Sequence, residues 1–269
     1  MATALSTLTS LRVLRLGFQS CLSLPDRPSR RLPHPKRFVL SVLIELWFEG
    51  VSEYVDDLVA RIDAPRLIKL DLAFFHQILF DTPELVQFIC RTPALEAPEE
   101  ARVIFMSSFA AIQLLSQAPD NGDLRVAILC ENREWPYPWR LPSLEQVCTS
   151  CLPSLSNLED LYISNHSRYT SNWQDYIESA KWLKLLQPFT TVKKLYLTQD
   201  FVQCIMSSLL EFVGERTTEV LPSLQNIFLE GLEMSGAVQE GIQQFFAMCQ
   251  AGHPIAVSRW DRGSREADD

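Results

Sequence analysis

Residues 155–163 have the sequence Leu155-Ser-Asn-Leu158-Glu-Asp-Leu161-Tyr-Ile163, which places apolar side chains at positions i, i+3, i+6 and i+8. Positions i+6 and i+8 are two residues apart, so in a β-strand their side chains point to the same side. Positions i and i+3 bring the chain in from a turn and are expected to be buried in the same layer. Such a unit cannot cover its own apolar face, and it must stack on copies of itself.

The same spacing recurs along the chain. The other clear copies are Leu8, Leu11, Leu14, Leu16; Leu40, Leu43, Leu46, Phe48; Ala64, Leu67, Leu70, Leu72; Phe189, Val192, Leu195, Leu197; and Leu221, Leu224, Ile227, Leu229. Successive copies start 32, 24, 91, 34 and 32 residues apart, and the gap of 91 has room for three units. A weak copy at Asn121, Leu124, Ala127 and Leu129 fits inside this gap. Another is expected near 101–106, without a defined register.

The segments between the copies have the apolar spacing of amphipathic helices. Val51, Val55, Leu58 and Ile62 follow a helical stripe. The tripeptide at 82–84, Thr-Pro-Glu, is typical of a helix start, with a cap, a proline at the first position and an acid in the first turn. Further helices are expected at 173–183, at 201–213 before Gly214, and at 238–249.

Strand and helix therefore alternate with a period of about 30 residues. This predicts an α/β leucine-rich-repeat solenoid, with a curved parallel sheet on the concave side and helices on the convex side. A doubly wound α/β domain also alternates strand and helix, but no glycine-rich turn follows any expected strand. We assign residues 1–258 to the solenoid, including a loop rich in proline and arginine at 25–37, and residues 259–269 to a polar C-terminal tail.

Composition restricts the partners and the compartment. A net charge of -9 disfavours nucleic-acid binding, because phosphate backbones are negative. No apolar run reaches the roughly 18–20 residues of a membrane helix, and the N-terminus does not resemble a signal peptide, so we expect no membrane association. The seven cysteines are odd in number and scattered. Cys90, Cys204 and Cys249 are expected on helix faces as small hydrophobes, which favours a cytoplasmic or nuclear protein.

The sequence contains few motifs that could catalyse a reaction or bind a metal. Cys148-Thr-Ser-Cys151 is the only CxxC pair and the four histidines are scattered, so we expect a structural role for these cysteines and no metal site. The acidic pairs at 56–57 and 99–100 are expected at the solvated surface. No hydrolase, phosphate-loop or zinc-protease motif is found. We expect a protein without enzymatic activity or cofactor; the alternative from another class is an enzyme that uses a thiol at Cys148 or Cys151.

Four segments carry a resemblance to a known family: Gly50–Pro65, Leu155–Ile163, Glu219–Gly231 and Pro254–Asp261. They resemble the F-box-type leucine-rich-repeat proteins that are abundant in mushroom-forming fungi. Members of the general class are substrate receptors of SCF ubiquitin ligases, in which the F-box binds the ligase adaptor and the repeats hold the protein to be ubiquitylated. The resemblance implies that this chain is the substrate-binding region of such a receptor.

The sequence departs from that family at its beginning. No F-box is visible, and a repeat follows Met1 almost at once, without a cap over its first apolar face. We expect a longer protein, and binding to the SCF adaptor only if an F-box lies upstream. The alternative is a non-ligase leucine-rich-repeat scaffold, or the sensor domain of a larger receptor. On either hypothesis the partner is a protein.

The residue between i+6 and i+8 points away from the core, toward the concave surface that solenoids use for binding. Through the chain this position holds Arg15, Trp47, Asp71, Ile128, Tyr162, Tyr196 and Phe228. Four of the seven are aromatic, and exposed aromatic side chains on a rigid sheet are good interface anchors. The alternatives are that aromatic residues simply suit strands, or that a loop packs on them.

Overall fold

The structure is a computed structural model of the full chain. It describes residues 10–18, 37–75, 80–116, 122–129, 139–152, 155–166, 179–212, 220–230 and 255–260. The expected helix at 238–249 and most of the proline- and arginine-rich loop at 25–37 lie outside the described residues. Of the expected helix at 173–183, only the last part lies within them.

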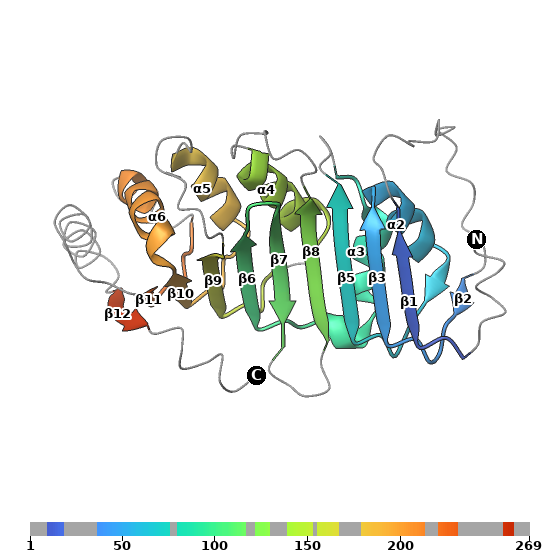
Figure 1. The fold of residues 1–269 in the computed structure, drawn as a ribbon. Helices are drawn as coiled ribbons and strands as arrows, with labels where there is room; N and C mark the ends of the chain where they lie inside the picture. The colour runs from blue at the N-terminus through green and yellow to red at the C-terminus, as the bar shows by residue number, and fades with distance from the viewer. Residues whose placement is uncertain are drawn as a thin grey trace.

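A large, mostly parallel sheet runs through the molecule (Figure 1). In spatial order its strands are β1 (Val13–Gly17), β3 (Glu45–Gly50), β5 (Lys69–Phe75), β8 (Asp123–Leu129), β7 (Phe109–Leu115), β6 (Glu100–Phe105), β9 (Asp160–Asn165), β10 (Lys194–Leu197), β11 (Asn226–Glu230) and β12 (Ala256–Trp260). A second, two-stranded sheet pairs β2 (Phe38–Val39) with β4 (Ile62–Asp63). The fold is therefore a mixed α/β architecture.

The described helices lie on one face of the large sheet (Figure 1). They are α2 (Ser52–Val59), α3 (Pro83–Cys90), α4 (Arg140–Ser150), α5 (Ser179–Leu186) and α6 (Gln199–Phe212), with a short 3-10 helix, η1, at Pro93–Leu95. A doubly wound sheet carries helices on both faces. The described part of this chain covers only one, which leaves the opposite face for other contacts.

The repeated spacing has a direct structural cause. In four copies the N–H at i+3 donates to the carbonyl at i, with N···O distances between 3.0 and 3.4 Å; the pairs are Leu43 to Leu40, Leu67 to Ala64, Leu158 to Leu155 and Leu224 to Leu221. This turn starts each strand at the same point relative to the spacing. The side chains at i+6 and i+8 then enter the core, as Leu161 and Ile163 do with at most 1% of their surface exposed.

The expectation of a wholly parallel sheet is wrong in the middle of the chain. β7 pairs antiparallel with both β6 and β8, and these three strands form a meander that reverses the strand order. The connection from β6 to β7 is short, and the N–H of Met106 donates to the carbonyl of Phe109 across it. Such a hairpin can join only antiparallel strands, because a parallel crossover needs a dozen or more residues, by a rough count.

The register of the weak copy at 121–129 is also wrong. Leu124 and Val126 of β8 lie opposite Leu70 and Leu72 of β5, so they occupy positions i+6 and i+8. The expectation had placed Ala127 and Leu129 there, three residues further along. The strand expected near 101–106 is confirmed as β6.

The described helices follow the apolar spacing with small shifts. α3 begins at Pro83 and α6 spans Gln199–Phe212, close to the expected ranges. α2 ends at Val59, and Ile62, expected as its last apolar residue, instead lies in β4. At the other end, β12 runs to Trp260, two residues past the expected boundary at 258. No helix in the described ranges is both long and apolar enough to span a membrane.

Candidate binding face

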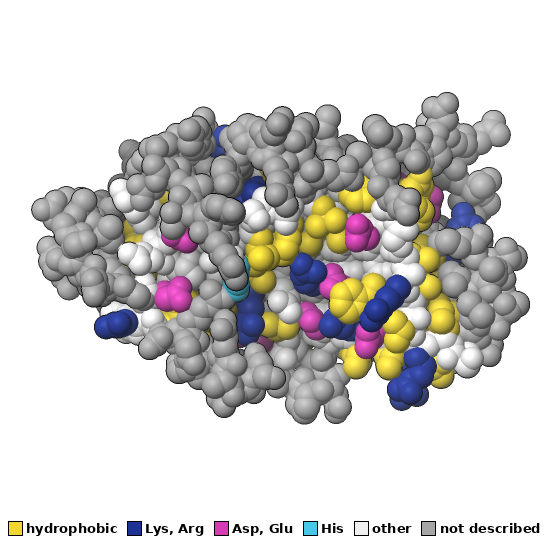
Figure 2. Space-filling view, viewed as in Figure 1, with side chains coloured by type: hydrophobic (Ala, Val, Ile, Leu, Met, Phe, Trp, Pro, Cys, Tyr) yellow, Lys and Arg dark blue, Asp and Glu magenta, His cyan; other side chains and the backbone are white. Residues whose placement is uncertain are grey.

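The face of the sheet opposite the described helices is called the open face here. One row of residues crosses it in strand register: Arg15, Trp47, Asp71, Arg125, Gln113, Arg102, Tyr162, Tyr196, Phe228 and Ser258. This row includes six residues that were expected at the binding surface: Arg15, Trp47, Asp71, Tyr162, Tyr196 and Phe228. Figure 2 shows apolar, basic and acidic side chains intermixed over β3, β5 and β8.

Trp47 of β3 is the centre of the first cluster on this face. Its partly buried indole has the Arg15 guanidinium 5.2 Å and the Lys69 ammonium 4.7 Å from the ring. Because these residues come from the two neighbouring strands, they flank the ring from both sides. The indole N–H donates to the carboxylate of Glu45 at 3.0 Å, which orients the ring. We call Trp47, Arg15, Lys69 and Glu45 the Trp47 cluster.

Asp71 of β5 and Arg125 of β8 form the next contact along the row. The Arg125 Nη1 lies 3.1 Å from Asp71 Oδ1, and Asp71 is only 7% exposed. Burial raises the pKa of the Asp71 carboxyl above its ordinary value, and the Arg125 charge and hydrogen bond oppose that rise. Ile128, expected on this face, is fully buried on the helix side opposite Phe74. The wrong register explains this error, and Arg125 takes the expected place.

Three aromatic rings from successive strands stack at the other end of the row. The ring centroids of Tyr162 and Tyr196 lie 4.1 Å apart with planes at 8°, and those of Tyr196 and Phe228 lie 4.5 Å apart at 11°. We call these three residues the aromatic ladder. Trp260 of β12 meets the ladder edge-on, 5.7 Å from Tyr162 and 5.4 Å from Tyr196. On the other side the Arg102 guanidinium lies 5.7 Å from the Tyr162 ring.

The ladder is not an exposed surface. Tyr162 is 6% exposed and Tyr196 is 7% exposed, so the expectation of accessible aromatic anchors is wrong for these two residues. Trp260 contributes to this burial. The apolar spacing did not predict the position of Trp260. Arg259 occupies position i+8 of the last unit, opposite Leu229, and interrupts the apolar spacing there. The apolar spacing did not predict Arg102, Gln113 and Arg125 on the open face, because it gave no correct register for the strands of the meander.

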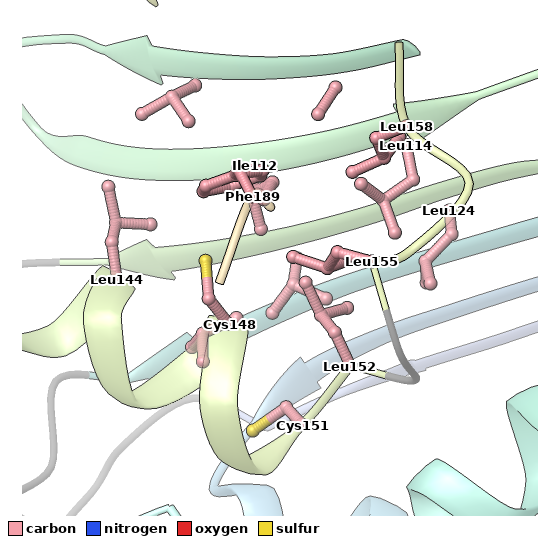
Figure 3. Packing of buried hydrophobic residues seen from close by; sticks show 14 of the residues in the cluster. Ile112, Leu114, Leu124, Leu144, Cys148, Cys151, Leu152, Leu155, Leu158 and Phe189 are labelled. Atoms are coloured by element: carbon pink, nitrogen blue, oxygen red, sulfur yellow. The ribbon is translucent and has the colours of Figure 1, made fainter. Parts of the chain in front are cut away.

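The two cysteines of the CxxC pair lie on α4 and just after it, facing the core. Figure 3 shows Cys148 among Leu144, Ile112 and Phe189, and Cys151 beside Leu152. Cys148 is 4% exposed and Cys151 is fully buried. Burial raises the pKa of the Cys148 thiol above its ordinary value and that of Cys151 to about 12. Neither thiol is therefore placed to act as a nucleophile at neutral pH.

Other titratable groups have structural contacts. Asp57 and Glu99 are exposed as expected, but Asp56 is 6% exposed and Glu100 is 7% exposed, so the expectation of solvated acidic pairs is wrong for both pairs. Cys90, expected to pack as a small hydrophobe, is exposed. The Nε2 atom of His166 lies 3.2 Å from the Ser164 hydroxyl oxygen. Among the residues that the structure describes, no three histidine, cysteine or acidic side chains are grouped to hold a metal ion.

Comparisons of the chain with models of protein families, with curated proteins and with solved structures gave no match. The resemblance to F-box-type repeat proteins therefore stays a hypothesis. A functional assignment depends on the chemistry of the open face.

Proposed function

We propose that this chain is a protein-recognition module that binds its partner on the open face. The Trp47 cluster is the observation that carries the proposal. It places a partly exposed indole between two cations on a face that no described helix covers. Tryptophan and arginine are the residue types that most often dominate binding energy in protein interfaces. The acids and bases around them supply selectivity for one partner.

The fold assignment belongs to the same proposal. Seven of the nine strand pairings in the large sheet are parallel, and the recurring turn at each strand start supports a leucine-rich-repeat solenoid. The β6–β8 meander interrupts it. A rigid, stacked sheet of this kind presents an extended surface with little loss of conformational entropy on binding.

The partner class follows from the family resemblance. We propose that the open face holds the substrate of an F-box-type SCF ubiquitin ligase. A segment upstream of the chain would then bind the ligase adaptor. Co-purification of an upstream-extended chain with the SCF adaptor, lost on deletion of the added segment, would support this. A folded, extended chain that does not co-purify with the adaptor would favour the second candidate, a scaffold or sensor module outside the ligase.

Recognition on the open face is tested by site-specific photo-crosslinking. One variant carries benzoylphenylalanine in place of Arg15, which is exposed on the open face; the matched control carries it in place of Lys184, which is exposed on α5. We expect one discrete crosslinked protein in cells from the first position, competed by uncrosslinked chain, and none from the second. Crosslinking from Lys184 alone would move the binding surface to the helices.

A further inference from the structure

Trp260 occupies part of the open face that its own strand does not reach. In β12 its Cα is in register with Glu230 of β11, at the edge of the sheet. Its ring nevertheless contacts Tyr196 of β10 and Tyr162 of β9. The side chain therefore lies back across the sheet, and it covers rings that belong to the second and third strands from its own.

β12 has few other attachments in the described residues. Ala256, Ser258 and Arg259 are exposed, and Val257 and Trp260 are only partly buried. The strand is held by parallel backbone pairing with β11, by the partly buried Val257, which packs against the core, and by the edge-on contacts of Trp260. By contrast, β11 buries Ile227 and Leu229 completely. Regions with few buried apolar contacts open at a lower free-energy cost than the core does.

We propose that β12 is an internal pseudo-ligand: the edge of β11 with which β12 pairs, together with the aromatic ladder, forms a docking groove for an extended peptide segment with an aromatic side chain. Trp260 fills this groove until a partner displaces it. This inference rests on the proposed function and names the partner's chemistry. The chain's own residues show the fit, because an extended strand with an indole is seated there.

The chemistry of the groove selects this kind of partner. An extended segment gains affinity from backbone hydrogen bonds to a strand edge and specificity from side chains that enter pockets. The ladder presents ring surfaces that favour an edge-on aromatic side chain over an aliphatic one. A partner must displace β12 to bind. Its apparent affinity is therefore the intrinsic affinity multiplied by the fraction of molecules in which β12 is undocked. Trp260 therefore sets a threshold for binding.

The test uses the chain's own strand as the probe. A fluorescent peptide with the sequence of residues 253–262 is titrated with the full-length chain, and binding is followed by fluorescence anisotropy. We expect Trp260→Ala to bind the peptide about tenfold tighter than the unmodified chain does, since its own strand has lost its anchor. Trp139→Ala is the matched control, because it removes a partly buried indole at the N-cap of α4, outside the groove. It should bind the peptide as the unmodified chain does.

A second peptide, with alanine in place of the tryptophan, should not bind any of the chains. Equal binding of both peptides, or equal affinity in Trp260→Ala and the unmodified chain, would overturn the proposal. If Trp260→Ala does not fold, Trp260→Leu keeps an apolar side chain there and takes its place.

Nitration by tetranitromethane gives an independent readout. Tyr162 and Tyr196 should react faster in the Trp260 variant than in the unmodified chain, and the tryptophan peptide should protect them. Unchanged reactivity of both tyrosines would also overturn the proposal. Crosslinking from position 15 does not depend on β12, so a failed docking groove and a failed open face give different results.

Discussion

The carboxylate of Asp56 in α2 accepts the backbone N–H of Leu85 in the first turn of α3, with an N···O distance of 2.9 Å. It thus satisfies one of the N–H groups that a helix start leaves without a partner. The neighbouring Thr82 does not supply this cap; its hydroxyl donates to the carbonyl of Ser150 at 3.3 Å. The contact therefore ties two successive units of the chain together through a helix terminus.

The Asp56 contact makes stability depend on pH. Burial raises the pKa of Asp56 from 3.8 to about 6, although the N–H groups of Leu85 and Glu84 lower it. Between these values the folded chain retains a proton that the unfolded chain has released, so the free energy of unfolding falls as the pH rises through this window. Asp56→Asn keeps the acceptor oxygen and should flatten that fall, as measured by urea unfolding across the window. Asp57→Asn, at the exposed neighbour, should leave it in place; identical curves for the two variants would contradict the assignment.

Tyr196 should contribute strongly to stability. Removing its buried ring in Tyr196→Ala leaves a cavity between Tyr162 and Phe228, and we expect a loss of about 3–5 kcal/mol in the free energy of unfolding. Tyr196→Phe keeps the stacked ring and should lose about 1 kcal/mol or less. Urea denaturation of both variants measures the difference. A small effect of Tyr196→Ala, comparable with that of Trp47→Ala at the partly exposed site, would show that the ladder is not packed as described.

The ion pair between Asp71 and Arg125 links β5 to the meander. A double-mutant cycle with Asp71→Asn and Arg125→Gln should give a coupling energy of about 1 kcal/mol, because the pair is partly buried. The four free energies of unfolding come from chemical denaturation. The control cycle pairs Asp71→Asn with Gln113→Ala. The side-chain amide of Gln113 donates to Asp123 rather than to Asp71. Coupling near zero for the first cycle would contradict a stabilising contact between Asp71 and Arg125.

The cysteines should differ in reactivity. Cys90 is exposed, so a maleimide should label it rapidly in the folded protein at neutral pH. Cys148 and Cys151 should be labelled only after unfolding, because burial both blocks access and raises their thiol pKa values. Peptide mapping by mass spectrometry after timed labelling measures each site. Rapid labelling of Cys148 in the folded chain would contradict its burial and would support the thiol-enzyme alternative.

Where the apolar spacing is unambiguous, it predicted both strand and register. Leu161 and Ile163 are buried in β9 as expected, and Leu195 and Leu197 repeat this in β10. At β8 the apolar residues fit the repeat spacing in more than one register. The predicted register differs by three residues from the register in which β8 pairs with β5. β7 has no repeat spacing at all, because it belongs to a hairpin rather than to a strand–helix unit.

The site shows the same division. Position i+7 correctly located Arg15, Trp47, Asp71, Tyr162, Tyr196 and Phe228 on one face of the sheet. Local alternation determines which side of a strand a side chain takes, but it says nothing about what covers that side. The exposure of Tyr196 therefore depends on the position of Trp260, which lies more than sixty residues further along the chain.

The sequence by itself determined the strand–helix alternation, the core positions of the clear copies and the side of the sheet that carries the aromatic residues. These properties are local, since they depend on side-chain spacing within one strand or helix. The tertiary structure decided the reversed order of β6, β7 and β8, the partner of Asp71 and the burial of the aromatic ladder. The partner of Asp71 and the burial of the ladder depend on contacts between distant segments, which local spacing does not encode because many pairings bury the same apolar side chains. The reversed order depends on the short hairpin between β6 and β7, which a strand–helix repeat does not predict.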